Sequence, residues 1–193
     1  MQYHPWDLDS YYNLIIEKTP LPQHVFQRNT RAVPILKNAH TWLRYVFETH
    51  SVSTDQQQTI VLLREPIERW ISGTKQFLKL HFPDIQYKRL EQMLNSEVIH
   101  DSHTLPQSYY VKDLDPNALT VITVDANTSS KLSQLLGVKI TTPPINTSTS
   151  TADQHLINLI KLYLSRNPQQ LELLKYIYAQ DYELLKGYPT GPT

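Results

Sequence analysis

The feature that most constrains the fold is a short apolar run, residues 33–36, that leads through a polar turn straight into a helical pattern. Two further runs of β-branched and aliphatic residues, 60–64 and 119–124, also end at or next to a charged residue and precede a helical pattern. Strands that alternate with helices in this way predict βαβ units, which join parallel strands by right-handed crossovers. The sequence therefore predicts an α/β fold with three layers, in which a small parallel sheet is flanked by helices.

Helices are expected wherever apolar residues recur with a period near 3.6. The expected helices cover residues 7 or 9 to 18, 41–50, 66–80, 84 to about 97, 128 or 129 to 137, 151–166 and 168–187. Thr151 and Gln154 have the spacing of a capping box at the start of one of them. Residues 101–110 show no regular period and are expected to form a polar loop.

The turn at residues 37–42 has the composition of an anion site. It directs backbone N–H groups and a helix N-terminus toward one point, while Lys37 adds a charge and Thr41 a hydroxyl. It is not a Walker A loop, because it has no glycine and its lysine and threonine are not adjacent. Without glycine, its residues must keep negative φ angles or carry strain. An ordinary strand–turn–helix corner is an equally good interpretation of these residues alone.

A second candidate anion site follows the next predicted strand. Arg64 ends that strand, Pro66 is suited to the first position of a helix, and Ser72 lies about two turns further on. If that helix packs along the sheet edge, the guanidinium and the hydroxyl can bind one anion from two sides. The alternative is that Arg64 pairs with Glu68 and that Ser72 faces a neighbouring helix.

Together the two segments, Lys-x-x-x-Thr and Arg-x-Pro-x-x-Arg-x-x-Ser, resemble the sulfotransferases that use 3′-phosphoadenosine 5′-phosphosulfate (PAPS). The carbohydrate (Golgi-type) branch is the most similar, since residues 101–107 resemble its Asp-x-His-x-x-Pro-Gln element and residues 144–148 and 177–185 are also similar to it. The resemblance implies a P-loop-NTPase-like sulfotransferase fold in a short soluble form. It assigns the 3′-phosphate to Arg64 and Ser72, and the 5′-phosphosulfate to Lys37, Asn38, Ala39, His40, Thr41 and Trp42.

The implied activity is transfer of a sulfuryl group from PAPS to a hydroxyl of a carbohydrate or another small acceptor, with 3′,5′-adenosine diphosphate as product and no metal. Lys37 is the expected stabiliser of the leaving phosphate. For the general base, His103 and His50 rank equally and Glu48 follows them. The expected substrate-binding residues are Asp101, which can also orient the ring of His103, together with His103, Gln107 and Tyr110.

Other interpretations remain open at this point. His40 occupies a position where the resembled loop usually has a small residue, so it either crowds the phosphate or donates to it. A non-catalytic nucleotide-binding or assembly protein on the same fold would keep both anion motifs. A P-loop-like kinase would need magnesium ligands and a glycine-rich loop. Lys75, Lys79, Lys88 and Arg89 are either a guide for an acidic glycan or a solvated helix face.

The composition of the chain limits the classes of partner and of cellular location that we expect. The 193 residues carry no net charge and no cysteine, and 40% of them are hydrophobic, which suits one domain over residues 1–193 with a sizeable core. Residues 1–30 are expected to form an N-terminal extension and residues 141–151 a flexible loop. Neutrality disfavours nucleic acid and anionic membranes as partners, and no apolar run approaches the ~20 residues of a membrane span. We expect a cytoplasmic protein without disulfides.

Overall fold

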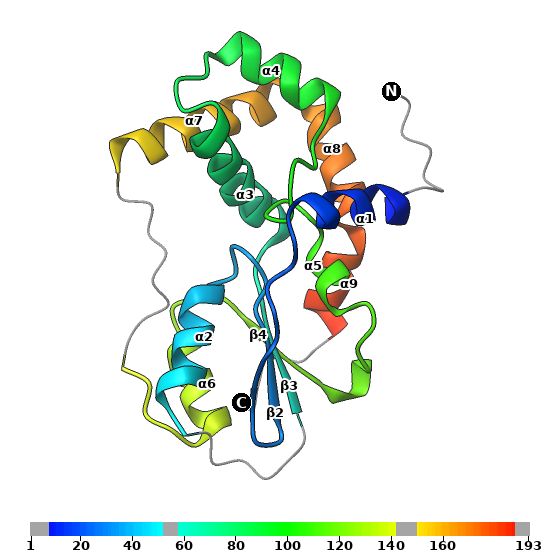
Figure 1. Ribbon diagram of the computed structural model, residues 1–193. Helices are drawn as coiled ribbons and strands as arrows, with labels where there is room; N and C mark the ends of the chain where they lie inside the picture. The colour runs from blue at the N-terminus through cyan, green and yellow to red at the C-terminus, as the bar shows by residue number, and fades with distance from the viewer. Residues whose placement is uncertain (1–7, 52–57, 142–149, 188–193) are drawn as a thin grey trace. The chain divides into compact units, whose positions relative to one another are not determined.

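The computed structural model describes residues 8–51, 58–141 and 150–187 (Figure 1). These residues form two compact units, each built from separate stretches of the chain. The sheet unit consists of residues 22–51, 58–65, 107–141 and 180–187, and the helical unit of residues 8–21, 66–106 and 150–179. The expected single domain therefore comprises two compact units. The expected N-terminal extension contributes to both of them, whereas most of the expected 141–151 loop lies outside the described residues.

The sheet unit is built on four strands in the order β1-β2-β3-β4 (Figure 1). Their bounds are Val25–Gln27 for β1, Thr30–Val33 for β2, Gln58–Leu63 for β3 and Leu119–Thr123 for β4. The last three strands are parallel, with Val33 opposite Val61 and Leu63 opposite Thr123. β1 runs antiparallel to β2. The α/β class is confirmed, but the sheet is mixed where a purely parallel one was expected.

The antiparallel strand arises from a tight hairpin that the sequence analysis missed. Gln27 pairs with Thr30, so that Arg28 and Asn29 alone form the turn, and Arg28 has a positive φ of 51°. Such a turn usually carries glycine or Asn-Gly, and this one does not. β2 ends at Val33, earlier than expected, because Pro34 has no N–H group to donate to the sheet.

Helices cover both faces of this sheet (Figure 1). On one face, α2 (His40–Thr49) and α6 (Thr128–Leu136) enclose a core in which Leu43, Ile60 and Leu132 are fully buried. Val61 and Leu63 point from β3 to the other face and are also buried, which is typical of a central parallel strand. On that side lie α5 (Gln107–Val111) and α9 (Ala179–Gly187), while a short 3-10 turn, η2 (Pro116–Ala118), precedes β4.

The helical unit contains α1 (Leu8–Lys18), α3 (Pro66–His81), α4 (Tyr87–Ser96), α7 (Thr151–Arg166) and α8 (Pro168–Ile177). Its main packing is α3 against α7, and Trp70 of α3 and Tyr163 of α7 are both fully buried. Across the same interface, the ammonium of Lys75 lies 3.1 Å from Asp153 Oδ2, and both residues are buried. A buried ion pair fixes the register of two helices because breaking it leaves a charge without compensation.

Most predicted helices are present within a few residues of their expected ends. Two details differ. The expected helix at 168–187 is two helices, α8 and α9. The N-cap of α7 is Ser150, whose Oγ accepts from Asp153 N at 3.1 Å, and not Thr151, which is already helical. The expected loop at 101–110 also contains the start of α5.

Candidate functional site

The centre of the candidate site is the β2–α2 turn, residues 37–39, in the sheet unit. Lys37 has a φ of 68° and Ala39 a φ of 58°, whereas Asn38 between them keeps a negative φ. The turn closes with a hydrogen bond from Asn38 N to Ile35 O at 3.0 Å, and α2 begins directly after it without a side-chain cap. Alternation of the sign of φ over residues 37–39 is the backbone pattern of an anion-binding nest, although the Asn38 N–H is already donated to Ile35 O.

The positive φ angles also mean that this turn is strained. The left-handed region costs a residue with a Cβ about 1–2 kcal/mol, and neither Lys37 nor Ala39 is glycine. The sequence analysis left two possibilities for a turn without glycine: that its residues keep negative φ angles, or that they carry strain. The structure shows the second, at Lys37 and Ala39. Strained backbone persists where surrounding contacts over-determine it, and it concentrates at ligand clamps.

The side chains of residues 37–42 divide into two groups. Those of Asn38, Ala39 and Trp42 are buried, so these residues present mainly backbone to any ligand. Lys37 and His40 are half-buried and Thr41 is exposed, with its Oγ1 3.3 Å from His40 Nε2. An anion at the N-terminus of α2 would therefore meet one ammonium, one hydroxyl and one imidazole.

Arg64 follows the last residue of β3, at the same sheet edge as the turn, and is half-buried. Its backbone is held by the side chain of Gln107: Arg64 N donates to Gln107 Oε1 at 2.9 Å, and Gln107 Nε2 donates to Arg64 O at 2.8 Å. Gln107 Oε1 also accepts from Asn38 Nδ2, which donates to Leu62 O at 2.7 Å as well. One amide thus links the β2–α2 turn to the end of β3.

This arrangement changes the expected role of two substrate-binding candidates. Gln107 is fully buried, and its amide is used entirely by protein groups, so it does not present hydrogen-bonding groups to a sugar. Tyr110 is 7% exposed, which leaves little of its ring for stacking on a substrate.

The other candidates on the Asp-x-His-x-x-Pro-Gln element lie in the helical unit. His103 Nδ1 is 3.0 Å from Asp101 Oδ2, and His103 N donates to Asp101 Oδ1 at 2.9 Å. The expected orientation of the ring by Asp101 is therefore present. With Nδ1–H donated to the carboxylate, Nε2 keeps its lone pair and can accept a proton.

The remaining base candidates, Glu48 and His50, lie at the C-terminal end of α2. That helix has ten residues, so its two ends are about 15 Å apart and the β2–α2 turn precedes the opposite end. Glu48 is exposed and 3.8 Å from Arg44, and His50 Nδ1 lies 2.9 Å from Thr49 Oγ1. The structure does not bring these two side chains to the turn.

Ser72 is half-buried in α3 of the helical unit, and the next residue explains how that helix packs. A Cβ on Gly73 would lie 2.8 Å from the carbonyl carbon of His103 and closer still to its oxygen, so only glycine allows this approach. Arg69 and Trp70 of the same helix donate to Leu105 O and Val98 O respectively. The segment that carries Asp101 and His103 is thereby held firmly against α3.

Two of the four cations considered for an acidic glycan have a structural role. Lys75 and Lys79 both bind Asp153, at 3.1 and 3.0 Å. Lys88 is exposed, and the guanidinium of Arg89 stacks over the ring of Phe82 at 5.0 Å.

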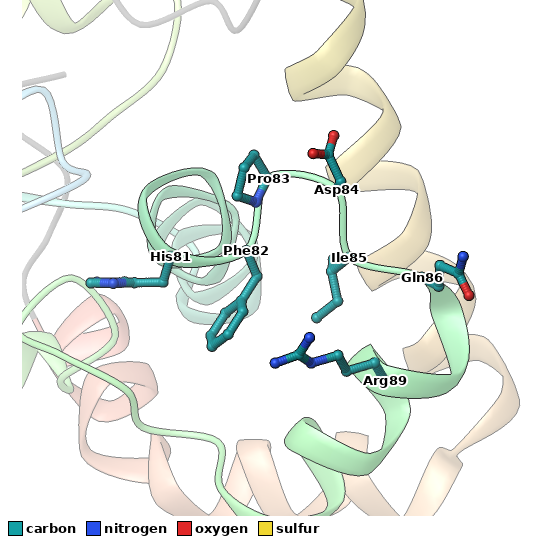
Figure 2. A pocket seen from close by; sticks show the side chains of 7 residues that line it. All are labelled: His81, Phe82, Pro83, Asp84, Ile85, Gln86 and Arg89. Carbon is teal, nitrogen blue, oxygen red and sulfur yellow. The ribbon is translucent and has the colours of Figure 1, made fainter.

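A hollow of about 430 Å³ lies between the end of α3 and the start of α4 (Figure 2). Phe82, Ile85 and Arg89 point toward the same space, whereas Asp84 and Gln86 point away from it (Figure 2). With one ring and one guanidinium already in contact with each other, this hollow does not indicate a single class of ligand.

Asp181 is a residue that the sequence analysis assigned no role. It is fully buried, and its carboxylate accepts from the N–H groups of Gln107 and Ser108, both at 2.7 Å. The only sequence signal for it was the resemblance of residues 177–185. Within the described ranges, no group of three or more histidine, aspartate or glutamate side chains is arranged to hold a metal ion.

None of the helices described is both long enough and apolar enough to cross a membrane. Comparison with models of protein families, with curated proteins and with solved structures finds no match to this chain.

Proposed function

We propose that this chain is a sulfotransferase that transfers a sulfuryl group from PAPS to a hydroxyl of a carbohydrate or another small acceptor. The observation that supports it most is the β2–α2 turn, where alternating φ signs, a helix N-terminus and Lys37 coincide at the carboxyl end of a parallel strand. Arg64 at the same edge adds a second cationic group. The pattern Arg64 to Ser72, which resembles the 3′-phosphate motif, distinguishes this nucleotide from ATP.

In the proposed reaction the acceptor oxygen forms a bond to sulfur, the bond from sulfur to the 5′-phosphate oxygen breaks, and that oxygen gains negative charge. Lys37 and the N–H groups of the turn stabilise this charge more in the transition state than in the ground state. Removing the Lys37 ammonium should lower turnover by about 10²–10³.

The acceptor hydroxyl must lose its proton to a base, and the resemblance of residues 101–107 to the Asp-x-His-x-x-Pro-Gln element makes His103 our proposed base. Its Nδ1 is held by Asp101, which leaves Nε2 as the acceptor nitrogen. His50 Nδ1 contacts Thr49 Oγ1 and Val46 O, not a carboxylate, and His50 lies at the far end of α2 from the turn. His103→Ala should therefore abolish most turnover, with nucleotide affinity retained, while His50→Ala retains both.

The deciding experiment is thermal unfolding with 3′,5′-adenosine diphosphate, compared with ATP and magnesium, for the wild type and Arg64→Ala. A ligand at a hundred times its dissociation constant stabilises the folded state by ~2.7 kcal/mol, which is a readable shift in Tm. We expect stabilisation by the bisphosphate that Arg64→Ala loses and that the control Arg44→Ala, an exposed arginine on α2, keeps. A shift only with ATP and magnesium, or none, refutes the sulfotransferase. Binding without turnover across an acceptor panel favours the non-catalytic alternative.

A further inference from the structure

The buried contacts of the sheet unit explain two motifs that the proposed chemistry does not use. The glutamine that ends the Asp-x-His-x-x-Pro-Gln element is Gln107, and the aspartate of residues 177–185 is Asp181. Both are completely buried, so neither touches a bound nucleotide. They contact each other twice: Asp181 Oδ2 accepts from Gln107 N at 2.7 Å and from Gln107 Nε2 at 3.3 Å.

Asp181 fixes the orientation of the Gln107 side chain. Its carboxylate accepts the first two N–H groups of α5 and so stabilises the positive end of that helix. The same carboxylate, together with Arg64 O, provides acceptors for Gln107 Nε2. A flipped amide would direct its NH₂ group at Asn38 Nδ2 and the Arg64 N–H, which are both donors, so only one orientation satisfies the network.

With its amide fixed, Gln107 determines where two other segments lie. Its side-chain amide accepts from Arg64 N and donates to Arg64 O, which are the same two hydrogen bonds that a residue of a neighbouring strand would make. These contacts hold the residue after β3 in line with the sheet. Its contact with Asn38 holds the middle residue of the β2–α2 turn, which is also tied to Leu62 O. Asn38 is flanked by the two residues with positive φ, Lys37 and Ala39.

The energetics explain why these contacts matter for the turn. Lys37 and Ala39 both hold a Cβ in the strained left-handed region, so the turn would relax if nothing held it. Hydrogen bonds to a charged group are among the strongest in a protein. Both polar atoms of the Gln107 amide have partners, whereas Asn38 Oδ1 has none among the described residues, so the Gln107 amide is the most firmly held part of the network. The carboxylate of Asp181 therefore stabilises the turn through Gln107 and Asn38.

We propose that Gln107 and Asp181 are positioning residues, which hold the β2–α2 turn and Arg64 in the one arrangement that binds the nucleotide. This inference rests on the proposed function. Neither residue contacts the ligand, and both act through Asn38 and Arg64. Gln107 and Asp181 thus belong to one hydrogen-bonded network, although their motifs lie far apart in the sequence.

The test compares Gln107→Met, Asp181→Asn and the control Gln27→Met with the wild type. Gln27, the last residue of β1, also donates its amide to a carbonyl in the sheet unit, Phe47 O at 3.1 Å, but Phe47 lies near the C-terminal end of α2, away from the β2–α2 turn. Affinity for 3′,5′-adenosine diphosphate is measured by calorimetry below the Tm of each protein. We expect affinity about tenfold weaker in Gln107→Met and Asp181→Asn, as for other supporting contacts of a binding site, and unchanged in Gln27→Met.

A measurement on the wild type alone keeps the proposal testable if a variant fails to fold. The Arg64 N–H, bound to Gln107 Oε1, should exchange with solvent as slowly as the amides inside β3. Fast exchange at Arg64, or unchanged affinity in folded Gln107→Met or Asp181→Asn, overturns the positioning role alone. Failure of the wild type to bind the bisphosphate refutes the proposed function and the positioning role with it.

Discussion

Protonation of His100 offers a sharp test of the packing in the helical unit. Its ring stacks on Phe77, with the centroids 4.8 Å apart and the planes at 21°, and its backbone N–H donates to Thr104 Oγ1 at 2.8 Å. Its Nε2 is buried, with no hydrogen-bond partner among the residues that the structure describes. Burial lowers the pKa of His100 from 6.5 to about 4, against a smaller opposing effect of the Asp101 carboxylate.

The direction and size of the effect follow from linkage. The folded state resists protonation of His100, while the unfolded chain takes up the proton near pH 6.5. Stability is therefore complete above pH 6.5 and falls as the pH is lowered toward 4. The difference of pKa corresponds to about 2 kcal/mol lost between pH 7 and 5, and about 3 kcal/mol by pH 4.

The assay is the free energy of unfolding in denaturant at pH 7, 6 and 5, for the wild type and His100→Phe. Phenylalanine keeps a ring against Phe77 and removes the titration, so the variant should lose about 2 kcal/mol less than the wild type over this range. His24, whose pKa is lowered by burial and by Arg31, contributes equally in both proteins. His155→Gln, which removes an exposed imidazole on α7, should follow the wild type. Parallel curves for the wild type and His100→Phe would refute the reasoning.

Three further pairs of substitutions, each a test and its control, examine the fold. Gly73→Ala should lower the free energy of unfolding by about 1–3 kcal/mol in denaturant, because its Cβ meets the backbone of His103, while Leu80→Ala at a 61% exposed position of α3 should not. Asp153→Ala should cost about 3–5 kcal/mol, because it removes the carboxylate that lies 3.1 Å from the buried Lys75 ammonium. Lys79→Ala should cost under about 1 kcal/mol, since that side chain is 53% exposed, and equal losses would contradict this account. Ser150→Ala should cost about 1 kcal/mol by thermal unfolding and Thr151→Ala much less, and the reverse order would show that Thr151 is the cap of α7.

The strands and helices were largely predictable because their signals are local. The β-branched runs gave β3 and β4 within two residues of their bounds, and apolar periodicity gave α2, α3 and α7. Gly137, with a φ of 65°, ends α6 as its position in the sequence indicated. The hairpin of β1 was missed because Arg28 and Asn29 do not have the composition of a two-residue turn.

The candidate site was predictable in its parts and not in its arrangement. Lys37 and Arg64 lie at one edge of the sheet as expected, because the ends of parallel strands meet there. Glu48 and His50 were candidates by residue type alone, and the length of α2 separates them from the turn. Gln107 was expected to bind substrate, but it is fully buried, and its amide is used by groups that are distant in the sequence.

By itself, the sequence determined the α/β class, the order of the elements and the strand–turn–helix segment that ends in Thr41, since these depend on residues close together in the chain. Only the tertiary structure decided that Lys37 and Ala39 take positive φ, and that Asn38, Arg64 and Asp181 meet at one buried amide. The physical reason is that strain in a short turn is tolerated only when distant groups hold it, and those groups are brought together by packing that no local pattern records.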